Sequence, residues 1–316
     1  MVKVEEIQNI AVIGAGFIGP GIAQVFASKG FNVALVDIKQ DILDRAIGEI
    51  KANLKLMAER GLGSTDEIEA ILKRIKTFSQ IDQAVANAHI VIEAVTEKLE
   101  LKQGIFQQLD ALCSEDTILS SNTSAISITE IAAKSIKRNR ILGTHFWNPP
   151  FLIPLVEIIK AKDTSDEAME ITFQVMLKAG KHPVKCLKDV PGFIANRLQH
   201  ALWREAINIV ASGIADAATV DEAIKNSFAI RLPVLGPLEN ADMVGLDLTM
   251  SIHDYLFKYL DTSREASPLL KEKVQQGNLG FKTGKGIYEW SPQKIYETRQ
   301  KLLEYLIDWA KKQSSM

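Results

Sequence analysis

The sequence of 316 residues predicts an α/β fold, in which a mostly parallel sheet with helices on both faces is followed by an all-helical domain. Up to about residue 190, short apolar runs alternate with segments of helical periodicity. A strong breaker, Lys188-Asp189-Val190-Pro191-Gly192, interrupts this pattern, and from Phe193 onward the apolar spacing is helical. We therefore expect one domain over 1–189 and a second over 190–316.

The segment from Asn9 to Asp37 predicts a dinucleotide site. An apolar run stops at a G-x-G-x-x-G motif, a helical stretch runs to Gly30, and a second apolar run ends on Asp37. This order of strand, glycine turn, helix, strand and acid is the full context of a Rossmann-type fingerprint. We expect the motif residues to approach the cofactor, namely Gly14, Ala15, Gly16, Phe17, Ile18 and Gly19. Asp37 would bond a ribose 2′-OH and repel a 2′-phosphate, so NAD is expected rather than NADP.

The other elements follow in chain order from periodicity and breakers. Helices are expected over 41–61, over 63–75 with Ser64 or Thr65 as cap, over 97–113 and over 127–136. Strands are expected over 75–78, 89–95 and 117–120, over 140–150 with a break at its two prolines, and over 153–161. The second domain should hold helices over 191–213, 218–230, 240–260, 267–277 and 292–312, with Thr219 and Glu222 spaced as a capping box.

Composition excludes several classes of protein. A formal net charge of −2 without a dense basic tract argues against nucleic-acid and membrane-surface binding, and no apolar run approaches membrane-spanning length. Cys113 and Cys186 lie far apart without metal-ligand neighbours, so we read them as reduced, buried thiols and expect no metal. The acidic start enters a strand within ten residues, which predicts no signal peptide and a cytoplasmic protein.

His145 is the most informative histidine. It ends an apolar run at the edge where open α/β sheets present ligand-facing residues, and Glu157 lies inside the next apolar run. If the two runs fold back on each other, the carboxylate would fix the imidazole tautomer and leave the other ring nitrogen as a base. The alternative is a surface histidine beside a charged strand end.

Four further residues carry two interpretations each. Ser124 follows a strand and could bond a substrate oxygen or form a turn, and Asn196 could bond substrate or satisfy backbone. Arg231, in apolar surroundings, needs a carboxylate, either a structural one such as Glu239 or Asp242 or that of a substrate. Lys282 lies in a glycine-rich loop and could reach phosphate or ribose, or be solvated.

Taken together, the motifs resemble the 3-hydroxyacyl-CoA dehydrogenase family over nearly the whole chain. They include NIAVIGAGFIGPGIA, IEAVTEKLELK, SSNTS, THFWNPP, LVEII, DVPGFIANRL, GPLENADMVGLDL and GFKTGKGIYEW. The resemblance implies a homodimer formed through the helical domain, with His145 as general base and Glu157 as its orienting carboxylate. It also implies that Ser124 and Asn196 bond the substrate oxygen and that Glu97, Lys102, Asn148 and Lys282 contact the cofactor.

Some features differ from family members that act on CoA esters. Those commonly read N-P-x-P-x-M-K after the histidine, whereas this chain continues Asn148-Pro149-Pro150-Phe151, and the helix after Asp37 is only modestly basic. The region of Arg231 is similar to the branch with lambda-crystallin/L-gulonate 3-dehydrogenase and carnitine dehydrogenase, which take free hydroxy acids. We expect an NAD-dependent L-3-hydroxyacyl-CoA dehydrogenase acting on a short-chain acyl substrate. The alternatives are a dehydrogenase of a free 3-hydroxy carboxylate bound by Arg231, and a non-catalytic NAD(H)-binding protein.

Overall fold

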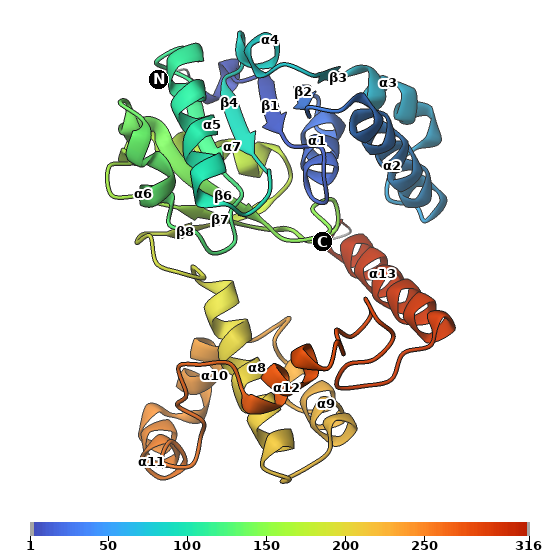
Figure 1. Ribbon diagram of the computed structural model, residues 1–316, viewed down its shortest axis with the longest axis vertical. Coiled ribbons are helices and arrows are strands. Elements are labelled where there is room, and N and C mark those ends of the chain that lie inside the picture. Colours follow the sequence, from blue (N-terminus) through green and yellow to red (C-terminus); the bar gives the residue numbers. More distant parts are fainter. Residues whose placement is uncertain (1–2, 315–316) are drawn as a thin grey trace. The chain divides into compact units, whose positions relative to one another are not determined.

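The computed structural model describes residues 3–314 (Figure 1). The chain groups into two compact units. One contains the residues up to Asn196 together with those from Leu302 on, and the other is Arg197–Lys301.

The first unit is built on one eight-stranded sheet with the order β3-β2-β1-β4-β5-β6-β7-β8. Adjacent strands are parallel, except that β6 and β7 pair antiparallel. The predicted mostly parallel α/β sheet is therefore confirmed. The strands are β1 (Asn9–Ile13), β2 (Asn32–Val36), β3 (Ile75–Phe78), β4 (Ile90–Glu93), β5 (Ile118–Ser121), β6 (Ile141–Phe146), β7 (Leu155–Ile159) and β8 (His182–Cys186).

Helices cover both faces of this sheet because the strand residues alternate between two apolar clusters. Ile10 and Val12 of β1 belong to one cluster, with residues of α1, α2 and α7, whereas Ala11 and Ile13 belong to the other, with residues of α4, α5 and α6. These helices are α1 (Gly19–Ser28), α2 (Gln40–Glu59), α3 (Ile68–Lys73), α4 (Ile81–Val85), α5 (Leu99–Leu112), α6 (Ile128–Ile131) and α7 (Asp166–Lys178).

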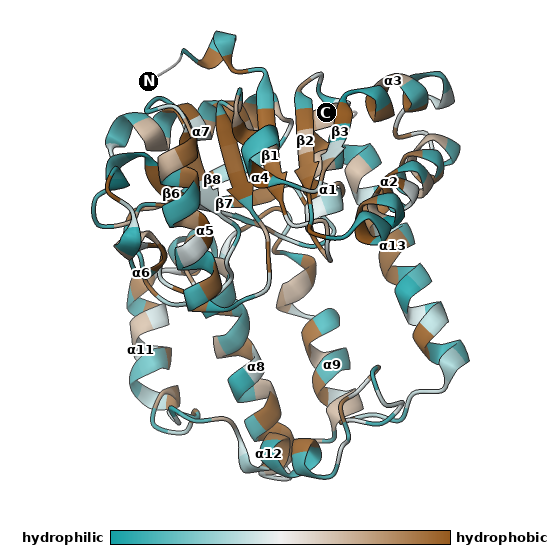
Figure 2. Cartoon of the chain, turned by 45° about the horizontal axis from the view of Figure 1, so that its top comes forward, coloured by the Kyte–Doolittle hydropathy of each residue, from teal (hydrophilic) through white to brown (hydrophobic). Residues whose placement is uncertain are grey.

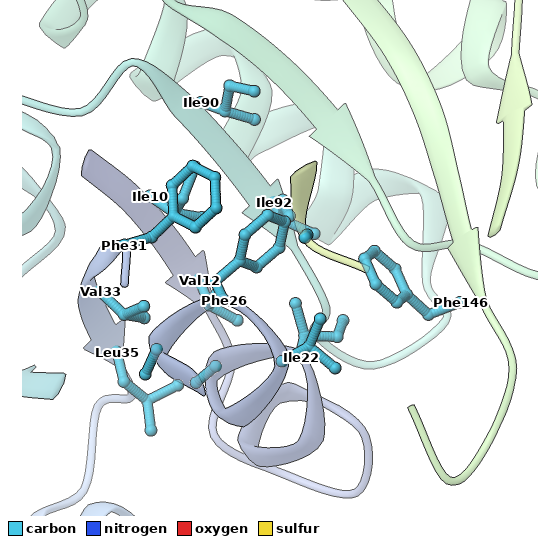
Figure 3. Packing of buried hydrophobic residues seen from close by; sticks show 14 of the residues in the cluster. Ile10, Val12, Ile22, Phe26, Phe31, Val33, Leu35, Ile90, Ile92 and Phe146 are labelled. Atoms are coloured by element: carbon cyan, nitrogen blue, oxygen red, sulfur yellow. The ribbon is translucent and has the colours of Figure 1, made fainter. Parts of the chain in front are cut away.

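Phe26 of α1 belongs to the first cluster and is fully buried. Its ring meets Phe31 and Phe146 edge-on, at centroid distances of 5.4 and 6.3 Å. Figure 3 shows Phe26 and Ile22 facing the apolar side chains of β1, β2 and β4. Because truncation of a buried phenylalanine costs about 3–5 kcal/mol, this packing fixes α1, and with it the glycine turn, against the sheet.

The second unit is helical, as predicted. Its elements are α8 (Ala195–Ala211), α9 (Ala217–Lys225), α10 (Pro237–Val244), α11 (Leu246–Leu256) and α12 (Pro268–Gln275), and α13 (Pro292–Ser314) starts in it. In Figure 2 the strands β1 and β2 are brown, whereas α8 and α9 carry both colours, as amphipathic helices do. The predicted capping box at Thr219 is wrong, because α9 begins at Ala217 and Asp216 accepts a hydrogen bond from the N–H of Thr219 (2.7 Å).

The boundary of the compact units differs from the predicted division at 189/190, which stays a prediction. Residues up to Asn196 group with the sheet because Phe193 is buried in the second apolar cluster. The last turns of α13 also group with the first unit, where Ile307 is 1% exposed. Within residues 3–314, no helix is long and apolar enough to span a membrane.

Candidate active site

The glycine turn after β1 has the geometry that a dinucleotide requires. Gly14 has φ +107°, and a Cβ atom there would lie 2.7 Å from the Ala94 carbonyl oxygen, while one on Gly19 would lie 1.8 Å from the Gly14 carbonyl oxygen. No side chain is tolerated at either position. Around Gly16, by contrast, a Cβ would meet no atom within 4 Å. The turn is therefore closed against the sheet and open where a pyrophosphate would approach the N-terminus of α1.

Asp37 lies just after β2 and is fastened to this turn. Its Oδ2 accepts a hydrogen bond from the N–H of Ala15 (3.0 Å), which leaves Oδ1 available to a ligand. The open turn and the acid beside it fit the phosphates and ribose of NAD.

His145 and Glu157 meet as the sequence predicted. The antiparallel pairing of β6 and β7 places the two residues directly opposite each other, and His145 Nδ1 lies 2.8 Å from Glu157 Oε2. His145 is 5% exposed and Glu157 is fully buried. The interpretation as a surface histidine is therefore wrong.

Glu157 is ionised and held from two sides. Its Oε1 accepts hydrogen bonds from the N–H groups of Ile194 (2.8 Å) and Ala195 (3.0 Å). Burial alone would raise the pKa of Glu157, but the hydrogen bonds from His145, Ala195 and Ile194 outweigh burial and lower it. A carboxylate accepts at His145 Nδ1, so Nδ1 carries the proton and Nε2 is left as an acceptor.

Ser124 and Asn196 complete the arrangement. Ser124 Oγ lies 3.1 Å from His145 Nε2, and Asn196 Nδ2 donates to the Ser124 carbonyl oxygen (3.3 Å). All four proposed catalytic residues belong to the first unit, and the serine hydroxyl is directed at the ring nitrogen that is free to take a proton.

A buried charge network lies beside this group, and sequence reasoning missed its centre, Glu93. Lys102 Nζ bonds both carboxylate oxygens of Glu93 (2.8 and 3.0 Å) and lies 3.3 Å from Glu97 Oε2. Lys102 is 1% exposed and Glu93 is fully buried. Glu93 is a carboxylate inside an apolar run, the same signal that identified Glu157.

Glu97 joins this network to the turn that carries Ser124. Its Oε1 accepts hydrogen bonds from the N–H groups of Ser124 (3.1 Å) and Ala125 (3.2 Å) and from the hydroxyl of Thr123. Burial would raise the pKa of Glu97, but the bonds from Thr123, Lys102 and Ala125 lower it, so the group is a carboxylate.

Three further predicted residues are exposed, namely Asn148 in the first unit and Arg231 and Lys282 in the second. The predicted structural partners of Arg231 are wrong: within residues 3–314 it forms no ion pair with Glu239 or Asp242. Glu239 instead accepts the N–H of Gly236 (2.7 Å) at the start of α10.

Both parts of the chain match models of one protein family. Residues 9–190 match the family model for the 3-hydroxyacyl-CoA dehydrogenase NAD binding domain, and residues 192–290 match that for the C-terminal domain. A probable 3-hydroxybutyryl-CoA dehydrogenase of Deinococcus radiodurans is 40% identical over 283 residues, covering 89% of this chain and 100% of that protein.

Two solved structures with a similar fold are named for different substrates. The (S)-3-hydroxybutyryl-CoA dehydrogenase from Ralstonia eutropha has a TM-score of 0.77 at 34% identity, covering 90% of this chain and 100% of its own. A 5-formyl-3-hydroxy-2-methylpyridine 4-carboxylic acid 5-dehydrogenase has a TM-score of 0.88 at 30% identity, covering 96% and 97%.

The matched models cover both units, and the open glycine turn fits the cofactor that the first model specifies. The protein is an NAD-dependent oxidoreductase that acts on a CH–OH group, and the chain belongs to the 3-hydroxyacyl-CoA dehydrogenase family.

Proposed function

We propose that the protein interconverts short-chain L-3-hydroxyacyl-CoA and 3-ketoacyl-CoA thioesters, with His145 as the general base. The observation that carries this proposal is the orientation of the imidazole. Nδ1 is committed to the buried carboxylate of Glu157, and Nε2 lies next to the Ser124 hydroxyl. A non-catalytic NAD(H)-binding protein would have no use for a base held in this way.

When bound at the glycine turn, NAD would supply the hydride acceptor for C3 of the substrate. His145 Nε2 takes the proton of the C3 hydroxyl, and Glu157 stabilises the imidazolium that forms. The Ser124 hydroxyl and the Asn196 amide bond the C3 oxygen as its charge changes during the reaction. In the reverse direction the imidazolium returns the proton to the ketone oxygen.

The cofactor contacts of this proposal are the residues predicted from the sequence. The turn from Gly14 to Gly19 would hold the pyrophosphate, Asp37 would bond the ribose, and Glu97, Asn148 and Lys282 would contact the nicotinamide half. Lys102 is almost fully buried between Glu93 and Glu97. We infer that it positions Glu97 and does not itself touch the cofactor.

A free 3-hydroxy carboxylate is the second candidate substrate. Arg231 is exposed and has no ion pair among the described residues, and the 5-dehydrogenase that this chain resembles acts on a pyridine carboxylate. A guanidinium suits a free carboxylate better than a neutral thioester.

The test compares NADH consumption with acetoacetyl-CoA and with a panel of free 3-keto acids. Wild-type protein should turn over acetoacetyl-CoA, and Arg231→Met should keep that activity. Turnover of free acids alone, lost in Arg231→Met, would replace the proposal with the second candidate. Activity with neither substrate would contradict both.

We also propose a cytoplasmic homodimer formed through the second unit. Large apolar side chains are widely exposed there, including Ile230 (70%), Val234 (88%), Leu238 (82%) and Tyr255 (69%). Exposed apolar surface of this extent is typical of sites that bind another protein chain. Sedimentation equilibrium should give twice the chain mass, and a monomer at micromolar concentration would contradict the proposal.

A further inference from the structure

Ser124, His145 and Glu157 form the same chain of contacts as a catalytic serine, its histidine and its acid. Ser124 Oγ lies 3.1 Å from His145 Nε2, and His145 Nδ1 lies 2.8 Å from Glu157 Oε2. A serine held in this way is a nucleophile in many acyl-transfer enzymes. A thioester substrate would bring an acyl carbon within two bonds of the reacting C3. The site must therefore avoid destroying its own substrate.

Acyl transfer also needs donors for the oxygen that becomes negatively charged. Serine hydrolases commonly use the N–H of the serine itself or of the residue that follows it. Here both of these N–H groups, of Ser124 and Ala125, donate to Glu97 Oε1 at 3.1 and 3.2 Å. A carboxylate occupies the place where an oxyanion would bind.

This carboxylate is held firmly in place. The Thr123 hydroxyl bonds the same oxygen, and Lys102 contacts the other oxygen at 3.3 Å. Lys102 is anchored in turn by Glu93, so Glu97 is tied to the buried core of the sheet at one end and to the Ser124 turn at the other.

We propose that Glu97 determines reaction specificity by preventing acyl transfer to Ser124. In the suppressed reaction Ser124 Oγ bonds the thioester carbon while its proton passes to His145 Nε2. The C–S bond then breaks, the thiolate leaves with that proton, and water hydrolyses the acyl-serine ester. The negative charge on the carbonyl oxygen would meet the Glu97 carboxylate in place of two N–H donors. The inference rests on the proposed CoA thioester substrate.

Loss of a single oxyanion donor slows acyl transfer by about 10²–10³-fold in a serine hydrolase. Both donors are engaged here, and the group that engages them is negatively charged. Removing the Glu97 side chain should therefore raise the rate of thioester cleavage by at least about 100-fold over wild type.

The experiment incubates Glu97→Ala with acetoacetyl-CoA in the absence of NADH and follows the release of free CoA thiol. Mass spectrometry of the quenched protein should locate an acyl group on Ser124. The double variant Glu97→Ala/Ser124→Ala is the matched control and should lose the gain. Glu97→Ser, whose side chain is also too short to reach the two N–H groups, provides a second variant if Glu97→Ala does not fold.

A folded Glu97→Ala or Glu97→Ser protein that releases thiol no faster than wild type would overturn the inference, as would a gain that survives loss of Ser124. The proposed function is tested separately, because wild-type protein is assayed for NADH oxidation with the same acetoacetyl-CoA. If wild type oxidises NADH but the Glu97 variants release no additional thiol, the inference is wrong and the proposed dehydrogenase function still holds.

Discussion

Replacing Glu157 with glutamine should nearly abolish turnover without unfolding the protein, because the structure dictates how the new amide must lie. Glu157 Oε1 accepts two backbone N–H groups, of Ile194 and Ala195. If the glutamine NH2 group faced these two N–H groups, buried donors would face each other. Each unsatisfied donor would then destabilise the protein by about 1–3 kcal/mol. The glutamine oxygen must therefore stay there, and its NH2 group must face His145 Nδ1.

That orientation reverses the tautomer of the imidazole. Because the glutamine NH2 group donates to it, Nδ1 becomes a hydrogen-bond acceptor and the ring proton moves to Nε2. With Nε2 protonated, the ring is no longer able to take the substrate proton. An equivalent Asp-to-Asn change in a serine protease triad lowers kcat by about 10⁴-fold. The same factor here corresponds to about 5 kcal/mol of activation free energy.

The assay is kcat for acetoacetyl-CoA reduction by NADH, with thermal unfolding and NADH titration as controls. We expect kcat to fall by about 10⁴-fold, with a small change in melting temperature and unchanged NADH affinity. A Glu157→Gln protein that keeps kcat within tenfold of wild type would refute the argument that Nδ1 must carry the proton. Glu157→Asp, which keeps the charge at a greater distance, should lose less.

Three other changes give separate tests. His145→Gln should abolish turnover and leave NADH affinity nearly intact, and a variant with most of its activity would remove the proposed base. Asp37→Ala should lower the ratio of kcat/KM with NAD to kcat/KM with NADP. An unchanged ratio would show that Asp37 does not contact the ribose 2′-OH. Burial lowers the pKa of Lys181 from 10.5 to about 8, and its Nζ donates to the carbonyl oxygens of Pro150 (2.6 Å) and Ile153 (2.5 Å), which a neutral amine still satisfies. Between those pH values Lys181 binds fewer protons in the folded state than in the unfolded state, so this residue makes the free energy of unfolding rise with pH, by up to about 1.4 kcal/mol per unit. In urea unfolding, the slope of this free energy against pH should be lower in Lys181→Met than in wild type by this amount, and equal slopes in the two proteins would refute the role of Lys181.

Sequence patterns predicted the parts of the fold that depend on local order. The glycine motif, its flanking strands and Asp37 are contiguous, so one physical requirement, close approach of backbone to a pyrophosphate, fixes them together. The meeting of His145 with Glu157 was also predictable, because two apolar runs joined by a short proline-rich loop pair in one register that buries both.

Other features depend on contacts that no local pattern contains. The edge strand β8 carries a proline and a lysine among five residues, so its sequence does not alternate clearly. The cap of α9 lies three residues before the predicted one because Asp216 competes with Thr219 for the same role. Glu93, nine residues before Lys102, carries the same local signal as Glu157, but its pairing with Lys102 emerges only when β4 and α5 pack.

The direct pairing of β6 with β7 has a consequence for how this enzyme family diversifies. The proposed base and its carboxylate are neighbours across one strand pair, whereas Arg231 lies in the other compact unit. In the proposed function, proton transfer and the binding of a free carboxylate therefore depend on separate stretches of the chain. If Arg231 selects the substrate as proposed, mutations near it would change which molecule is accepted and leave the pairing of β6 with β7 intact, so the proposed proton transfer would stay the same.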